Sequence, residues 1–73
     1  MNNNKREGFL HEDKNTKRYV LNGQPLHCGD CFDVEINGTW VPTRIESYFA
    51  SDVWYLVGTG FEGNNLEGLH VRR

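Results

Sequence analysis

The pair Asn37-Gly38 constrains this chain more than any other feature, because it lies between two runs in which apolar and polar residues alternate. Asn-Gly in that setting is the strongest short signal for a two-residue hairpin turn of type I′, which needs a positive φ at both positions. A two-residue loop fixes how residues 31–36 pair with residues 39–46. The sequence therefore predicts a β-hairpin of known register in the middle of the chain.

The two faces of this hairpin differ in character. In the predicted register Glu35 lies opposite Trp40, and one face carries apolar side chains together with a threonine: Phe32, Val34, Ile36, Val41, Thr43 and Ile45. The other face carries Asp33, Glu35, Trp40, Pro42, Arg44 and Glu46. We expect the first face to be core, because alternation and turn chemistry agree. Pro42 lacks an N–H toward the next strand, so pairing there should be interrupted or the strand should lie at an edge.

The remaining apolar runs are short and are separated by Asn, Asp and Gly. They cover residues 8–11, 17–21, 53–58 and 69–72, and no stretch has apolar residues at helical spacing over three turns. A chain of 73 residues is enough for one small domain. Short strands at regular spacing with turn signals predict an all-β barrel or sandwich. We expect a flexible N-terminal tail over residues 1–6 and a single domain over residues 7–73.

Nine aromatic residues are many for this length. A core this small gives only a few kcal/mol of net stability, so the large rings should supply much of the buried area. Residues 53–57 are apolar on both faces, and we assign Trp54 and Leu56 to the core. Tyr55 should then point outward with its two valine neighbours. The loop at residues 47–52 carries Tyr48 and Phe49, which are not needed to close it.

Charge is distributed unevenly along the chain. Residues 1–20 hold five basic and three acidic side chains, whereas residues 21–71 hold seven acidic side chains and a single basic one. The body therefore lacks the basic face that a non-specific nucleic-acid binder needs. If the two ends lie side by side, a local basic patch can still form, and it defines a nucleic-acid alternative. Its residues are Lys5, Arg6, Lys17, Arg18, Arg72 and Arg73.

Cys28 and Cys31 form a C-x-x-C pair, which raises a metal or redox alternative. A redox pair uses a helix N-terminus to lower the pKa of its first thiol, but this pair leads into a strand. Structural zinc takes four ligands, and a second pair is absent, although His27 could join the two cysteines. In the simpler interpretation Gly29-Asp30 forms a turn between two small side chains. We expect no cofactor.

No arrangement of residues points to catalysis. Neither Ser47 nor Ser51 has an oxyanion-hole signature, and no Ser or Cys has a His and a carboxylate nearby in the sequence. The outer-face carboxylates would lie on a solvated surface with little depth to shift a pKa. The start lacks the apolar segment of a signal peptide, and no apolar run approaches a membrane span. We therefore expect a cytoplasmic protein that is not an enzyme.

Three short sequence motifs occur together in this chain: Gly29-Asp30 entering a strand, Gly38-x-Trp40 in the hairpin, and Gly68-Leu69-x-Val71-Arg72 near the end. They resemble a family of short uncharacterised proteins, a domain of unknown function of Gram-positive bacteria and their mobile elements, over residues 8–72. The layout is also similar to SH3-like barrels. The resemblance implies a small SH3-like barrel of five or six short antiparallel strands. It implies no established activity, so no functional residue is carried over.

Trp40 is the side chain that most suggests a function. An outward Trp flanked by charge is typical of a protein-binding hot spot, although the ring could instead pack under a loop and enlarge the core. We interpret the chain as a non-enzymatic protein-interaction module, a mobile-element or phage accessory or inhibitor protein, and either a monomer or a weak homodimer. The expected contact face consists of Trp40, Arg44, Tyr48, Phe49 and Tyr55, edged by Asp33 and Glu35.

Overall fold

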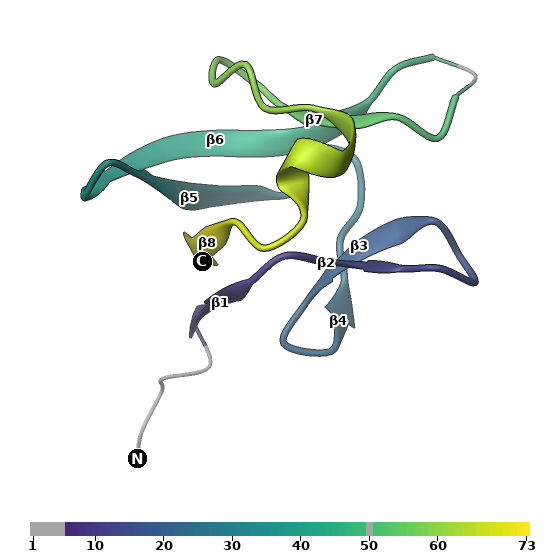
Figure 1. The fold of residues 1–73 in the computed structure, drawn as a ribbon, viewed down its shortest axis with the longest axis horizontal. Coiled ribbons are helices and arrows are strands. Elements are labelled where there is room, and N and C mark those ends of the chain that lie inside the picture. The colour runs from purple at the N-terminus through teal and green to yellow at the C-terminus, as the bar shows by residue number, and fades with distance from the viewer. Residues whose placement is uncertain (1–5, 50) are drawn as a thin grey trace.

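A computed structural model describes residues 6–49 and 51–73, and within them the chain is built of short β-strands (Figure 1). Eight strands and one 3₁₀ turn follow one another in the described residues. The strands are β1 (Glu7–Phe9), β2 (His11–Asp13), β3 (Arg18–Leu21), β4 (Gln24–Pro25), β5 (Cys31–Ile36), β6 (Thr39–Ser47), β7 (Trp54–Leu56) and β8 (His70–Arg72), and the 3₁₀ turn η2 covers Gly63–Leu66.

The strands form two antiparallel sheets, of five strands in the order β1-β8-β5-β6-β7 and of three in the order β2-β3-β4. The predicted all-β class and small barrel-like form are confirmed. The strand number is eight rather than five or six for two local reasons. The run at residues 8–11 is divided at Leu10 between the two sheets, and Asn22-Gly23 closes a further short hairpin onto β4.

The central hairpin has the predicted register at every pair, from Ile36 opposite Thr39 to Phe32 opposite Thr43. Asn37 and Gly38 have φ values of 52° and 84°, as a type I′ turn requires. The strand partner β7 pairs with β6 only over residues 45–47. Pairing on that side therefore stops before Pro42, which agrees with the interruption expected from its missing N–H.

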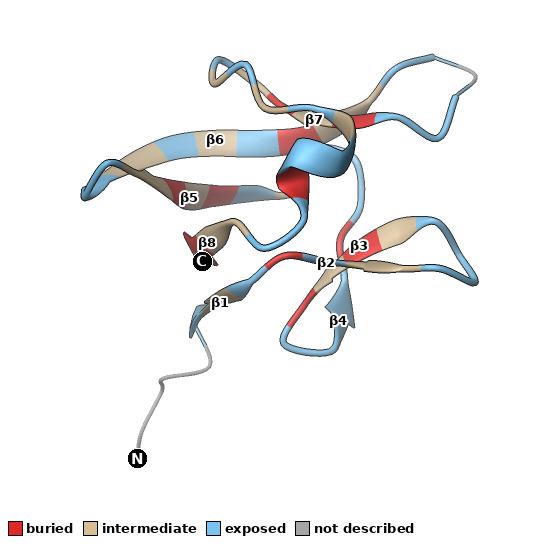
Figure 2. Cartoon of the chain, viewed as in Figure 1, coloured by how far each residue is buried: buried red, intermediate tan, exposed pale blue. Residues whose placement is uncertain are grey.

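The core lies where the two sheets and η2 meet, as the buried segments in Figure 2 show. Phe32, Val34 and Ile45 of the hairpin's inner face are buried, and Trp54 and Leu56 of β7 join them as expected. The inner-face residues nearer the hairpin tip are only partly buried, because the second sheet does not extend under them. Tyr55 is half-buried on the other face of β7.

Leu10 is the residue at which the chain passes from the first sheet to the second. Its side chain is 1% exposed, and its backbone is held from both sides. Its N–H donates to the carbonyl of Leu69 at 2.9 Å, and its carbonyl accepts from the N–H of Gly68 at 2.8 Å. The two sheets are therefore joined through one buried residue that is bonded to the segment entering β8.

Trp54 links the same two sheets at a second place. Its indole Nε1–H donates to the carbonyl of Lys17 at 2.9 Å, just before β3. The guanidinium carbon of Arg18 lies 5.4 Å from the centre of the indole ring, within the range of a cation–π contact. Because the ring is 8% exposed, this contact is made at the border of the core.

Glu67, between η2 and β8, is bonded to β2 through both of its carboxylate oxygens. Its Oε1 accepts the backbone N–H of Glu12 at 3.0 Å, and its Oε2 lies 2.9 Å from Nδ1 of His11. The backbone hydrogen bond from Glu12, followed by the contact with His11, lowers the pKa of Glu67 below its ordinary value of 4.5. This carboxylate thus helps to hold the second sheet against the segment before β8.

We predict that Trp54→Ala lowers the free energy of unfolding by about 3–5 kcal/mol, because it empties a large buried site. That loss is comparable with the whole stability of a domain this small, so the variant should be largely unfolded. Trp54→Phe keeps most of the volume and loses the hydrogen bond to Lys17, at a cost of about 1 kcal/mol. Urea denaturation followed by circular dichroism measures both effects, and an alanine variant as stable as the parent chain would contradict the assignment.

We predict that Glu67→Gln reduces stability at neutral pH by less than about 1 kcal/mol, since the carboxylate is partly exposed. The folded-state pKa lies below the unfolded one, so the charged form stabilises the fold above the unfolded pKa. That contribution is lost as the pH falls through the folded pKa. Unfolding curves taken between neutral pH and about pH 3 should therefore converge for the variant and the parent chain. A stability difference that stays constant over this range contradicts the prediction.

Candidate protein-binding face

Charged and aromatic residues share the outer face of the first sheet, because directly opposed residues of an antiparallel pair point to the same side. Trp40 of β6 lies opposite Glu35 of β5. Asp33 of β5 lies opposite Arg72 of β8. On the far side of β8, His70 lies opposite Phe9 of β1. Four neighbouring strands thus present one continuous outer surface, which faces away from the core.

Three rings on this surface form what we call the aromatic row: Phe9, His70 and Trp40. The ring centroids of Phe9 and His70 are 5.0 Å apart and the rings are stacked, with 25° between their planes. His70 and Trp40 are also 5.0 Å apart, at a tilt of 59°. Phe9 at one end is 64% exposed. The row is therefore an accessible aromatic surface, and none of its three residues belongs to the core cluster.

Polar contacts with charged side chains hold the aromatic row in place. The guanidinium carbon of Arg72 lies 4.4 Å from the centre of the Trp40 ring, and its Nε is 3.0 Å from Oδ2 of Asp33. The imidazole Nε2 of His70 lies 3.1 Å from Oε1 of Glu7, and its Nδ1 lies 3.9 Å from the carboxylate of Glu35. Arg72 and His70 are thus each held by a carboxylate and an aromatic ring, which fixes the positions of their side chains on this face.

Trp40 lies where the hairpin register predicts, on the outer face and outside the core cluster. It is half-buried, since His70 and Arg72 cover part of its ring. Arg44 lies farther along the same face of β6, where its Nε is 2.9 Å from a carboxylate oxygen of Glu46. The structure therefore gathers Trp40 with Asp33 and Glu35 and leaves Arg44 paired along its own strand.

Two other aromatic residues of the expected contact face, Tyr48 and Tyr55, form a separate cluster. Tyr48 and Tyr55 stack with centroids 4.4 Å apart, and the hydroxyl of Tyr48 donates to Oε1 of Glu62 at 2.7 Å. That hydrogen bond raises the pKa of Tyr48 above its ordinary value. Tyr55 pairs with a residue six positions beyond Trp40 on β6, a distance of roughly 20 Å along a strand. One compact site from these residues and Trp40 is therefore not formed.

Phe49 follows Tyr48 in the loop between β6 and β7 and is 100% exposed. Its neighbour Ala50 lies outside the described residues. The ring of Phe49 makes no aromatic contact with another ring of the described chain. It is an isolated apolar side chain in the described structure, distinct from both clusters.

Sequence reasoning missed the contribution of Phe9 and assigned Arg72 only to the nucleic-acid alternative. The alternation of residues 69–71 does indicate that His70 points outward. What it cannot indicate is that β1 pairs with β8, which brings Phe9 beside His70. A strand pairing between opposite ends of the chain leaves no local signal.

The expected basic patch is divided in the structure. Arg6 and Arg73 lie together: Nε of Arg6 donates to the Arg73 carbonyl at 2.8 Å, and the Arg73 N–H donates to the Arg6 carbonyl at 2.9 Å. Arg72 is engaged by Asp33 and Trp40. Lys17 lies just before β3 and Arg18 is its first residue, whose guanidinium donates to the carbonyl of Leu26. Lys5, like the rest of the expected tail except Arg6, lies outside the described residues.

The C-x-x-C segment forms a turn. Gly29 has a φ of 91°, a conformation that favours glycine, and the Cys31 thiol donates to the carbonyl of Gly29 at 3.5 Å. Cys28 contacts the hydroxyl of Ser47, and the imidazole of His27 lies 3.8 Å from a carboxylate oxygen of Asp30. Both cysteines are exposed and free. Residues 6–49 and 51–73 contain no group of three or more potential ligands placed to hold a metal ion.

The fold and this face define an all-β domain whose distinguishing surface is an aromatic row in contact with charged side chains. Residues 8–73 match the family described as a domain of unknown function (DUF5348), and the chain belongs to that family. The match spans nearly the whole chain, as the resemblance implied. The function of this family is unknown.

A solved structure of a protein from Ruminococcus gnavus is similar to this chain, with 46% sequence identity and a TM-score of 0.75. The match covers 93% of this chain and 100% of the other. The comparison with curated proteins finds no match. Over the residues that the structure describes, no helix is long and apolar enough to cross a membrane.

We predict that Trp40→Ala leaves the domain folded and costs about 1–2 kcal/mol of stability, from the lost contact with Arg72 and the partly buried ring. Trp40→Phe should cost less, because an aromatic face remains beneath the guanidinium. Amide chemical shifts and urea unfolding of both variants measure the effect. If Trp40→Ala unfolds the domain as completely as Trp54→Ala, the indole acts as core and the face is misassigned.

Proposed function

We propose that this chain is a non-enzymatic interaction module that binds another protein through the outer face of its first sheet. The observation that carries the proposal is the aromatic row, with Phe9 exposed at one end and Trp40 beside Arg72 at the other. Aromatic residues and Arg are enriched at protein interfaces, and Trp and Arg are frequent hot spots. A core residue would not be exposed as Phe9 is.

The arrangement suits recognition because its polar groups are already positioned. Arg72 is held by Asp33, and His70 is held by Glu7. Side chains that are ordered before binding lose less conformational entropy when a partner docks. The rings would supply buried area, while the carboxylates at the rim would select the orientation of the partner through charge complementarity.

Three further parts of the proposal rest on the resemblance and on the sequence. We place the fold among SH3-like barrels, a view supported by the tight central hairpin and by the last strand closing against the first. We assign the protein to the cytoplasm, where its two cysteines would remain reduced. We take its biological setting to be that of a mobile-element or phage accessory or inhibitor protein, as a monomer or a weak homodimer.

The proposal predicts that partner capture depends on the aromatic row. The immobilised protein should retain a specific protein from a lysate of its host, and Phe9→Ala or Trp40→Ala should reduce that retention at least about tenfold. Phe49→Ala is the matched control, because it removes an exposed phenyl ring that lies apart from the row. Quantitative mass spectrometry of the retained proteins, with and without nuclease, gives the measurement.

Each outcome of this experiment has a distinct meaning. Retention that survives in the control and disappears in both row variants supports the proposed face. Retention that is lost on nuclease treatment contradicts a protein partner and supports the nucleic-acid alternative. Loss in Phe49→Ala with no loss in Phe9→Ala contradicts the proposed face and moves the site to the β6–β7 loop.

A further inference from the structure

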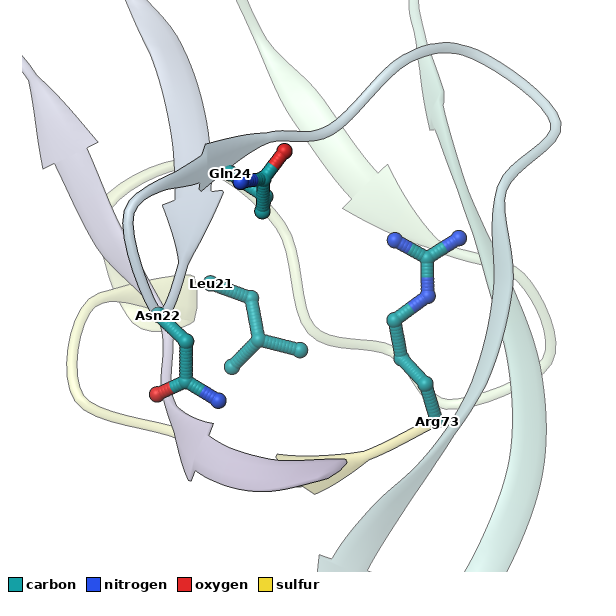
Figure 3. A pocket seen from close by; sticks show the side chains of 4 residues that line it. All are labelled: Leu21, Asn22, Gln24 and Arg73. Atoms are coloured by element: carbon teal, nitrogen blue, oxygen red, sulfur yellow. The ribbon is translucent and has the colours of Figure 1, made fainter. Parts of the chain in front are cut away.

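A cavity lies away from the aromatic row, between the β3–β4 turn and the end of the described chain. It has a volume of about 360 Å³ and is lined by Leu21, Asn22, Gln24 and Arg73 (Figure 3). The side chain of Leu21 is 3% exposed and forms an apolar floor. In Figure 3 Arg73 and Asn22 stand on opposite sides, with Leu21 between them and Gln24 at the upper edge.

The walls of this cavity are held in place by the surrounding backbone. The Asn22 amide donates to the carbonyl of Glu7 at 3.0 Å, which fixes the turn against β1. A Cβ atom at Gly8 would lie 2.5 Å from Oδ1 of Asn22 and 2.9 Å from Cδ1 of Leu21, so a larger residue there would displace these two side chains. On the other side, Arg73 exchanges two backbone-directed hydrogen bonds with Arg6.

The charge of the lining favours an anion. None of the four lining residues is acidic, and Arg73 contributes a guanidinium group. Asp30 forms a long ion pair with this group: its Oδ1 lies 4.0 Å from Nη2 of Arg73, farther than a hydrogen bond. The planar guanidinium can therefore still direct two N–H groups to one carboxylate, the geometry for which Arg is best suited.

We infer that this cavity binds a carboxylate carried next to a short aliphatic group. The carboxylate would accept hydrogen bonds from the Arg73 guanidinium, and the aliphatic group would rest on Leu21. The Gln24 amide would meet a polar group between the two. The volume is near the lower end of the range for small-molecule sites, so it suits a ligand about the size of one amino-acid residue. Such a carboxylate can come from a free short-chain acid or from the end of a peptide.

The test is titration of the ¹⁵N-labelled protein with N-acetyl-leucine, hexanoate and N-acetyl-leucinamide. The two carboxylates should shift the amide signals of Leu21, Gly23 and Gln24 with a dissociation constant of roughly 1 mM, a weak affinity in keeping with so small a ligand. The uncharged amide should cause no saturable shift at these residues. Tighter binding of N-acetyl-leucine than of hexanoate identifies a peptide end as the source, and the reverse order identifies a free acid.

Two variants separate a specific site from a general effect of charge. Arg73→Gln should weaken carboxylate binding at least about tenfold, because it removes the guanidinium and keeps the backbone bonds to Arg6. Arg44→Gln, on β6 beside Glu46, should leave binding unchanged. Equal binding of the amide and the acid, no saturable shift from either carboxylate, or equal losses in the two variants would each overturn the inference. Thermal unfolding of both variants verifies that they remain folded.

Discussion

The fold depends on the passage of the chain through Leu10. One buried residue leaves β1 in the first sheet and enters β2 in the second, and both of its backbone polar groups are bonded to residues 68 and 69. A buried backbone group without a partner would cost free energy, so this pairing is what allows the crossing to be buried. Because Leu10 is fixed, Phe9 on one side of it stacks on His70. On the other side, the turn of the β2–β3 hairpin accepts the hydrogen bond from Trp54.

The two tryptophans show how the same residue type serves different purposes on the two faces of one sheet. Trp54 lies at the border of the core, and its indole N–H donates to the carbonyl of Lys17 in the turn between β2 and β3. Trp40 lies on the outer face, where a guanidinium and an imidazole cover part of it. A domain this small needs buried apolar area. The residues of its inner face supply that area, and Trp40 is not among them. The partly exposed ring on the outer face is therefore free of a core role, as the proposed binding face requires.

The parts of the structure that the sequence predicts are local. The β5–β6 pairing follows from Asn37-Gly38 and from alternation, because a two-residue turn leaves a single register. The second Asn-Gly pair, Asn22-Gly23, has φ values of 53° and 81° and carried the same signal for the β3–β4 hairpin. The aromatic row was not predictable in this way, because it requires β1 to meet β8. From the sequence, Tyr48 and Tyr55 are grouped with Trp40 as aromatic residues of one contact face, but the length of β6 separates them from Trp40.

The pairing of β1 with β8 has a consequence for how the molecule folds. Glu7 and Arg72 are partners although 65 positions separate them (72 − 7 = 65). Contacts that close so long a loop form late, because the chain loses much entropy before they stabilise it, whereas the β5–β6 hairpin closes across two residues. We expect the hairpin to form first and the two ends to join it afterwards. The proposed binding face would then exist only in the fully folded molecule, so that a partner recognising Phe9 together with Trp40 would distinguish fully folded chains from partly folded ones.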